Sequence, residues 1–420
     1  MLLYRIFLLL YKGGISLASL WNYKARLWII GRKNVFPILK TARHECSGKK
    51  VIWMHCASLG EFEQGRPLLK KIKEQSPEVE FFISFFSPSG YEKIKNDGDY
   101  KYVFYLPMDS AANAKKWVEI LKPHIVFWIK YEYWYFYLQQ IKKNNIPLIM
   151  VSAIYKPSQT FFKWYGNFYK EMLYSFTHFF VQNADSKLVL QTIIPENKIS
   201  IAGDTRCDRV INIATNFVEV PGLSEFCDGQ KVVVIGSSWE DDEAEWAHFV
   251  RTQKNIKFVI APHEIDEANI RDVKKRFPGS ILYSDWLIQL KKLHEPGESY
   301  NCLVINNIGI LSRLYFYADI TYVGGGFGKN GLHNILEAAV FGKPVIFGPE
   351  YEKNFEASAL INNSGAISIE NALDLEKVLH SLLDHPLEMI SRGEASKKYV
   401  YDNSGATEKI MAYLLNGNYI

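Results

Sequence analysis

Short apolar runs alternate along the chain with segments of helical spacing, and this alternation begins near residue 50. We expect strands at 50–58, 79–87, 101–106, 125–131, 146–153, 178–183 and 198–202, and then at 232–236, 256–261, 280–283, 302–306, 319–324 and 344–348. Strands that alternate with helices are typical of parallel sheets covered by helices on both faces. The sequence therefore predicts an α/β fold with two Rossmann-like halves.

The alternation is lost around Pro221-Gly222, and we interpret residues 216–230 as a linker. The predicted domains are an N-terminal segment at 1–45, a Rossmann-like domain at 46–215, and a second one with C-terminal helices at 231–420. The two Rossmann-like domains are expected to face a cleft. Ligands of open parallel sheets bind beyond the carboxyl ends of the strands, so the loops from strand to helix are the places to look for chemistry.

Residues 1–21 are apolar but are interrupted by Arg5, Lys12 and Gly13-Gly14, which makes them marginal as a membrane-spanning helix. The next segment, 22–50, has eight basic residues and one acidic residue, a net charge of +7, whereas residues 51–420 carry −5. A basic run beside an apolar segment is typical of the cytoplasmic surface of a membrane. We expect membrane association through a spanning or a surface-lying helix, and the alternative is a helix packed on the protein's own core.

The composition narrows the class of protein further. The 420 residues are 48% apolar with a net charge of only +4, which excludes a disordered or fibrous chain. Because the basic residues gather at the N-terminus, the charge pattern argues against a nucleic-acid-binding protein. Five dispersed cysteines without metal-finger spacing indicate reduced thiols in a cytosolic compartment.

Three charged residues stand just after predicted strands. Glu61 opens a helix, where it is either a carboxylate of the cleft or a partner of the helix dipole. Glu132 lies among aromatic residues, where it either holds a ligand or pairs with Lys130. Arg206 suits a phosphate, and its alternative is a surface ion pair with Asp204 or Asp208.

The glycine-rich stretch 324–337 follows a strand and runs into a helix, an arrangement that favours a phosphate near the backbone. Gly326, Gly328 and Gly331 also match the G-x-G-x-x-G pattern of dinucleotide-binding folds, which is weak by itself. Glu337, one turn into the helix, is placed to accept the ribose hydroxyls of a nucleotide. The tripeptide 97–99 imitates a metal-binding D-x-D motif, but we interpret it as a turn.

Several of these motifs together resemble one family. The stretches ASLGEF (57–62), LPMDS (106–110), VQNADSK (181–187), GDTRCD (203–208), IGSSWEDDE (235–243) and GGGFGKNGLHNILEAAVFGKPVIFGP (324–349), with Glu132, Trp134 and Asn354-Phe355, follow the order seen in transferases of 3-deoxy-D-manno-octulosonic acid (Kdo). The resemblance extends from about residue 2 to residue 415.

This resemblance implies a GT-B fold and an inverting transfer of Kdo from CMP-Kdo to lipid IVA, with no metal and no other cofactor. It also implies a place at the cytoplasmic face of the inner membrane, among inner-membrane lipids. By motif match, Glu61 is the general base, and Glu132 and Arg206 stabilise the transition state. The implied contacts of CMP are Pro262, His263, Gly309, Ile310, Leu311, Asn334, Ile335, Leu336 and Glu337.

The chain departs from the family pattern at Arg206, where lysine is usual, and at Lys130, where an acid is usual. Further departures are Tyr135 for proline, Leu332 for glycine, and Ala261 in a usual Pro-Arg-His loop, which here reads Ala-Pro-His. Two other classes stay open at this point, a nucleotide-dependent oxidoreductase and a non-catalytic sensor of sugar nucleotides. The aromatic residues between 161 and 180 are either core or a surface that contacts acyl chains.

Overall fold

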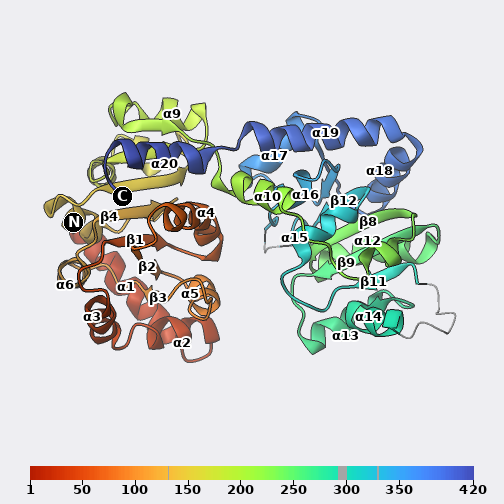
Figure 1. Ribbon diagram of the computed structural model, residues 1–420, viewed down its shortest axis with the longest axis horizontal. Coiled ribbons are helices and arrows are strands. Elements are labelled where there is room, and N and C mark those ends of the chain that lie inside the picture. Colours follow the sequence, from red (N-terminus) through yellow and green to blue (C-terminus); the bar gives the residue numbers. More distant parts are fainter. Residues whose placement is uncertain (131, 292–299, 329–330) are drawn as a thin grey trace. The chain divides into compact units, whose positions relative to one another are not determined.

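The chain forms two compact units, each built around its own parallel sheet (Figure 1). The computed structural model describes residues 1–130, 132–291, 300–328 and 331–420. Unit 1 comprises Met1–Asp208 and Ser404–Ile420, and unit 2 comprises Arg209–Asn403. The expectation of two Rossmann-like sheets is confirmed.

The sheet of unit 1 has the order β3-β2-β1-β4-β5-β6-β7, and all of its pairings are parallel. Its strands are β1 (Val51–Cys56), β2 (Glu80–Phe85), β3 (Tyr102–Tyr105), β4 (Ile125–Ile129), β5 (Leu148–Ala153), β6 (His178–Val181) and β7 (Ile199–Ile201). Strands β1, β4 and β5 are buried along their whole length, as parallel strands covered on both faces are. The order reverses between β1 and β4, which makes the carboxyl ends of these two strands the expected ligand site.

Helices cover both faces of this sheet. They are α1 (Leu2–Ala18), α2 (Tyr23–Ile30), α3 (Val35–Glu45), α4 (Leu59–Gln75), α5 (Pro88–Ile94), α6 (Ala111–Leu121), α7 (Tyr135–Lys143), α8 (Asn167–Leu173), α9 (Ala184–Leu190) and α20 (Ala406–Asn416), with short 3-10 turns at Thr160–Phe162 and Glu196–Lys198. Helix α10 (Thr205–Thr215) begins in unit 1 and ends in unit 2. On one face Trp53 of β1 packs against Trp117 of α6. On the other face Met54 joins a core with Leu68 of α4 and Ile410 of α20.

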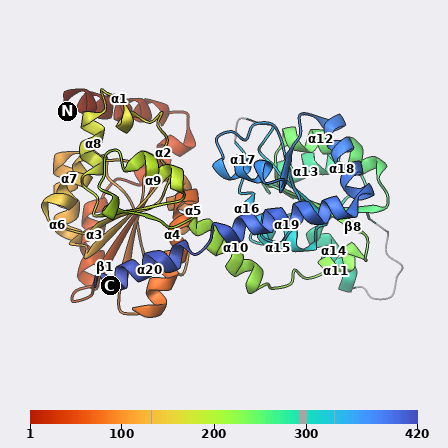
Figure 2. The same cartoon turned by 90° about the horizontal axis from the view of Figure 1, so that it is seen from above.

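Helix α1 lies beside α8, with one side packed against the rest of unit 1 (Figure 2). Its inner side carries Tyr4, whose ring centroid is 5.4 Å from that of Phe168, and the buried Leu8. Its other side exposes large apolar residues, namely Leu2, Leu3, Ile6, Phe7, Leu9 and Leu10. Within the described residues no single helix is long and apolar enough to span a membrane, and only α1 and α2 together, bent by 120°, pass that test.

The aromatic stretch 161–180 divides between core and surface. Phe161, Phe176, Phe179 and Phe180 are buried, whereas Trp164, Tyr165, Tyr169 and Tyr174 are exposed. The core interpretation is therefore confirmed for the four buried side chains, and contact of the exposed ones with acyl chains stays a prediction.

The sheet of unit 2 has the order β10-β11-β9-β8-β12-β13-β14, again parallel throughout. Its strands are β8 (Lys231–Ser238), β9 (Ile256–Pro262), β10 (Ile281–Leu282), β11 (Cys302–Val304), β12 (Ile320–Val323), β13 (Val345–Phe347) and β14 (Ala366–Ser368). Its helices are α11 (Leu223–Cys227), α12 (Glu240–Thr252), α13 (Glu267–Arg276), α14 (Tyr283–Lys291), α15 (Leu311–Leu314), α16 (Leu336–Ala339), α17 (Phe355–Asn362), α18 (Ala372–Asp384) and α19 (Pro386–Asp402), with a 3-10 turn at Tyr315–Tyr317. The order reverses between β8 and β12, so their ends form the expected ligand site of this unit.

The units divide the chain differently from the predicted domains. Residues 404–420 pack with unit 1 instead of ending the second domain, because α20 buries its apolar side on the first sheet and Asp208 accepts hydrogen bonds from the N–H groups of Gly405 and Thr407. The predicted linker 216–230 also contains a packed helix, α11, whose Leu223 and Phe226 are buried in unit 2. The division instead falls between Asp208 and Arg209, inside α10.

Candidate active site

The three charged residues singled out in the first half of the sequence follow strands β1, β4 and β7 of unit 1. Glu61 lies in the first turn of α4, Glu132 follows β4, and Arg206 lies in the first turn of α10. Since β1 and β4 are neighbours at the reversal of strand order, Glu61 and Glu132 meet at one edge of the sheet.

Glu61 is buried, with only 8% of its surface exposed. Its carboxylate accepts a hydrogen bond from the N–H of Ala57, just ahead of α4. Burial raises the pKa of Glu61 to about 8, and the charge of Glu132 adds to the rise, while the Ala57 N–H and Lys130 oppose it. Once it is ionised, a carboxylate whose pKa is this high accepts a proton readily, which suits a general base. The same carboxylate also satisfies a free N–H at the helix start, so the structural role left open by the sequence is present too.

The Glu132 carboxylate is held by two ring N–H groups. Its Oε2 lies 3.0 Å from Nε2 of His55 and 3.0 Å from Nε1 of Trp134. The indole of Trp128 also donates to the main-chain oxygen of Glu132 at 2.6 Å. His55 and Trp134 are thus partners of Glu132 that the sequence did not suggest, and its pairing with Lys130 stays a prediction.

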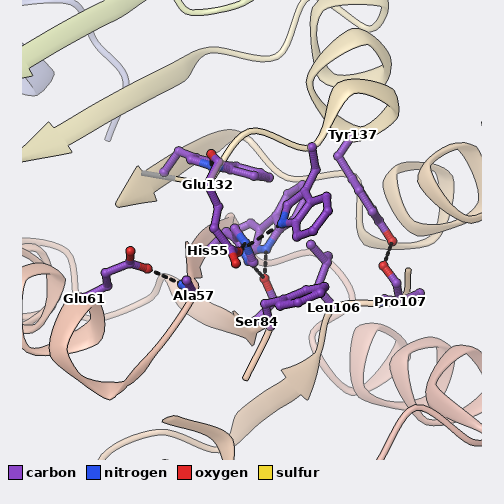
Figure 3. A network of polar contacts seen from close by, with 12 residues as sticks. His55, Ala57, Glu61, Ser84, Leu106, Pro107, Glu132 and Tyr137 are labelled. Atoms are coloured by element: carbon purple, nitrogen blue, oxygen red, sulfur yellow. Dashed lines mark hydrogen bonds and ion pairs between the residues drawn. The ribbon is translucent and has the colours of Figure 1, made fainter. Parts of the chain in front are cut away.

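A buried chain of hydrogen bonds orients His55 (Figure 3). Trp53 Nε1 donates to Ser84 Oγ at 2.8 Å, and Ser84 Oγ lies 2.9 Å from His55 Nδ1. Because Ser84 accepts from Trp53, its own proton is available for Nδ1, which leaves the ring proton on Nε2 facing Glu132. All three side chains are fully buried, so the orientation of Glu132 is set by the interior of unit 1.

Arg206 forms an ion pair with Asp204, with Nη2 2.7 Å from Oδ2. This pair is one of the two alternatives from the sequence, but Asp204 is buried, so it is not a surface pair. Burial disfavours the charge of Asp204, yet the attraction of Arg206 outweighs it and holds the pKa of Asp204 below its usual value. Asp208, the other alternative, caps α20 instead.

Gln64, one turn after Glu61 on α4, links the two cations of the site. With its amide oxygen turned toward them, it accepts from Lys130 Nζ at 2.9 Å and from Arg206 Nε at 3.1 Å. Lys130 also lowers the pKa of both Glu61 and Asp204. Two carboxylates and two cations of unit 1 are therefore gathered at one edge, and all three predicted catalytic residues are among them.

Sequence reasoning gave no role to His55, Ser84 or Gln64. His55 follows Trp53 by two positions on a strand, so both side chains point to the same face, and this spacing is the one signal that was available. The identity of the partner strand, and hence the contact with Glu132, cannot be read from that spacing.

In unit 2 three aromatic side chains stack at the ends of β8, β9 and β12. The rings of Trp239 and His263 are 4.5 Å apart, and those of His263 and His333 are 4.4 Å apart. Trp239 Nε1 donates to His333 Nε2 at 2.8 Å. Burial, assisted by His263, lowers the pKa of His333 to about 4, so this imidazole is neutral near pH 7.

The glycines at the end of β12 serve the packing of the protein itself. A Cβ at Gly324 would lie 2.3 Å from the main-chain oxygen of Ser237, and one at Gly326 would lie 2.7 Å from the nitrogen of Gly348. Asp242 fixes this loop by accepting from the N–H of Gly325 at 2.9 Å. Gly324 and Gly326 therefore make room for neighbouring backbone, and the phosphate near this stretch stays a prediction. Residues 329 and 330 of the predicted motif lie outside the described residues.

Glu337 is paired within unit 2. Its Oε1 lies 3.2 Å from Nη1 of Arg209 and 3.3 Å from Nδ2 of Asn334. Asn334 in turn accepts from the N–H of Leu336 at 3.3 Å. Arg209 was not anticipated, because it is 128 positions away in the sequence.

The other predicted nucleotide contacts lie at loops beyond the strands of unit 2. Pro262 ends β9, Gly309 has a φ of +93°, and Ile310 and Leu311 start α15. The side chains of Ile335 and Leu336 are buried, so any ligand contact there involves their main chain.

Asp97 pairs with Arg66 and accepts from the N–H of Asp99, which agrees with the interpretation of 97–99 as a turn. In the described part of the chain, no three His, Cys, Asp or Glu side chains gather as a metal site would require.

Residues 31–209 match the family model of 3-deoxy-D-manno-octulosonic-acid transferase. The 3-deoxy-D-manno-octulosonic acid transferase of Haemophilus influenzae is 23% identical over 384 residues, covering 88% of this chain and 87% of its own length. The enzyme of the same name from Aquifex aeolicus is 26% identical over 358 residues, covering 84% and 90%.

Among solved structures, UDP-GlcNAc 2-epimerase from Neisseria meningitidis has a TM-score of 0.61 at 15% identity, covering 87% of this chain and all of its own. MurG of Acinetobacter baumannii has a TM-score of 0.56 at 10% identity, covering 88% and 99%. These likenesses show the fold, which is GT-B-like. The matching segment 31–209 and the alignments along most of the length make this chain similar to the 3-deoxy-D-manno-octulosonic acid transferases.

Proposed function

We propose that this protein transfers Kdo from CMP-Kdo to lipid IVA with inversion at the anomeric carbon. The observation that carries the proposal is Glu61, a buried carboxyl group with a raised pKa, beside Glu132 and two cations at the strand-order reversal of unit 1. The identity of the transferred sugar is taken from the names of the relatives. In the proposal Glu61 is the base, and Glu132 and the cations balance the charges that develop during the transfer.

In this reaction Glu61 takes the proton from a sugar hydroxyl of lipid IVA. The electron pair left on the hydroxyl oxygen forms a bond to the anomeric carbon of Kdo. The bond between that carbon and the phosphate oxygen breaks, and its electrons leave with CMP. A hydroxyl has a high pKa, so the attack needs a base in place. Glu132 stabilises the positive charge that develops on the sugar, and Arg206 stabilises the negative charge that develops on the phosphate.

The donor nucleotide is assigned to unit 2. We expect its phosphate to lie near the start of α16, where the N–H of Leu336 already has Asn334 as its acceptor, and we expect Pro262 and His263, at the end of β9, to contact the nucleotide. Glu337 accepts the ribose hydroxyls in exchange for its present contact with Arg209.

We place the enzyme at the cytoplasmic face of the inner membrane, where a lipid acceptor lies. The apolar outer side of α1 supports this placement, since Leu3 is 82% exposed and Leu9 is 71% exposed. Exposed lysines at positions 24, 33 and 40 add attraction to anionic lipids.

The test is the transfer of labelled Kdo from CMP-Kdo to detergent-dispersed lipid IVA. The wild-type protein should form labelled product, and Glu61→Gln should lose about 10²–10⁴-fold in rate, because an amide cannot take the proton. Glu63→Gln, two positions further on α4, is the matched control and should keep the wild-type rate. No transfer by the wild-type protein, or full transfer by Glu61→Gln, would refute the proposal.

A further inference from the structure

Helix α7 begins immediately after the loop that carries Glu132, and its start has no cap of its own. The N-cap residue, Trp134, makes no side-chain hydrogen bond to the helix. The first N–H groups of any helix lack partners inside the helix, so acceptors must come from elsewhere.

Two residues distant in sequence supply those acceptors. Asp109, in the loop between β3 and α6, accepts from the N–H of Phe136 at 3.0 Å and from that of Tyr137 at 3.2 Å. The hydroxyl of Tyr4, on α1, accepts from the N–H of Tyr135 at 3.3 Å and donates to Asp109 at 2.6 Å. One carboxylate and one hydroxyl thus replace the missing cap.

This cap is buried and therefore costly to break. Asp109 is only 3% exposed, and its negative charge lies at the positive end of the helix dipole. Removing the Tyr4 hydroxyl would leave the N–H of Tyr135 and one oxygen of Asp109 without that partner, and buried polar groups without partners are expensive. The ring of Tyr4 would stay in place through its contacts with Phe136 and Phe168.

The capped turn is joined directly to the candidate active site. Trp134 is the residue before that turn, and its indole donates to the Glu132 carboxylate at 3.0 Å. A shift in the first turn of α7 therefore displaces Trp134 and, through it, Glu132.

We propose that Tyr4 and Asp109 are positioning residues for Glu132, so that the N-terminal helix is part of the support of the active site as well as an apolar surface. The inference rests on the proposed function for its activity readout. It assigns to α1 a role that remains when the acceptor is dispersed in detergent and no membrane is present.

The test compares full-length Tyr4→Phe with Tyr23→Phe, which removes a hydroxyl from an exposed tyrosine on α2. Transfer is measured in detergent, per mole of folded protein counted by CMP titration. For Tyr4→Phe we expect kcat to fall by about tenfold, within the range known for small displacements of catalytic groups, while KM for CMP-Kdo is unchanged. Tyr23→Phe should match the wild type. Asp109→Asn should act in the same direction as Tyr4→Phe.

A second measurement, independent of activity, is amide hydrogen exchange of residues 132–138 in Tyr4→Phe. Faster exchange there is expected, because the N–H of Tyr135 loses its acceptor. Unchanged exchange would overturn the cap, and faster exchange with a wild-type kcat would overturn the positioning role. If the wild-type protein transfers no Kdo, the proposed function fails, and the exchange experiment still decides whether Tyr4 holds the start of α7.

Discussion

Nε2 of His55 lies 3.0 Å from Oε2 of Glu132, and the histidine is completely buried while the carboxylate is 20% exposed. The contact joins two neighbouring strands at the point where their order reverses. The interior of the sheet thereby fixes a group that faces solvent, which is how a preorganised site avoids reorientation during a reaction.

If this contact orients Glu132, His55→Leu should lower kcat for Kdo transfer by about tenfold or more and leave KM for CMP-Kdo unchanged, because misplacement of a catalytic group lowers turnover. His178→Leu is the matched control. That histidine is also buried in unit 1 and bonded to a serine, with Nε2 2.9 Å from Ser200 Oγ. Equal losses of kcat in both variants would mean that His55 only contributes to stability.

The pH dependence of transfer should report the interaction between Glu61 and Glu132. Glu61 has to be ionised to accept a proton, so kcat/KM should rise with pH through its pKa of about 8. The negative charge of Glu132 helps to raise that pKa, and Glu132→Gln removes it. The rising limb of the kcat/KM profile of Glu132→Gln should therefore move to lower pH, even if this variant has a lower maximal rate than the wild type.

Glu63→Gln is the control for this experiment, and its limb should coincide with that of the wild type. A limb that stays in place in Glu132→Gln would show that the charge of Glu132 does not raise the pKa of Glu61 in the active enzyme.

The sequence predicted the parts of the structure that local pattern determines. Apolar runs predicted strands in their observed order, and the rule that ligands bind beyond strand ends led to Glu61 and Glu132, which the structure brings together beyond β1 and β4. The position of α20 was missed, because an amphipathic helix such as Ala406–Asn416 shows only that it has an apolar side, not which of two sheets that side covers.

The hydrogen-bond partners of the basic side chains could not be predicted from the sequence either. The basic run in segment 22–50 was predicted to lie at an anionic membrane surface, yet Arg32 donates to the carbonyls of Phe86 and Leu106, and Arg43 donates to that of Leu121. None of these three carbonyl acceptors has a signature in the sequence. Part of the net charge of +7 in this segment therefore belongs to side chains that are hydrogen-bonded inside unit 1.

Binding of CMP should depend on Glu337. If its carboxylate accepts both ribose hydroxyls, Glu337→Gln should weaken CMP binding by about 1–3 kcal/mol, roughly 5- to 150-fold, measured by calorimetry. Glu388→Gln disrupts another Glu–Arg pair of unit 2, that with Arg392, and should leave the affinity unchanged. An unaltered affinity in Glu337→Gln would assign this residue to its contact with Arg209 alone.

Docking at a membrane should combine two forces that respond differently to salt. The outer side of α1 contributes burial of apolar surface, about 25 cal/mol per Å², which salt does not screen. The exposed lysines of segment 22–50 contribute about 1 kcal/mol each near an anionic surface, and salt screens that attraction. Because Arg32 and Arg43 bond to carbonyls, we expect this part to be smaller than the net charge suggests.

Replacing Leu3 and Leu10 together by serine should therefore turn tight binding into weak, salt-sensitive binding in a flotation assay with anionic vesicles. The wild-type protein should float at both low and high salt, and the double variant only at low salt. Leu387→Ser, at an equally exposed leucine of α19 in unit 2, is the control and should behave like the wild type. If the double variant still floats at high salt, another apolar surface binds the membrane. Trp164, which is 89% exposed, would then be the next residue to replace.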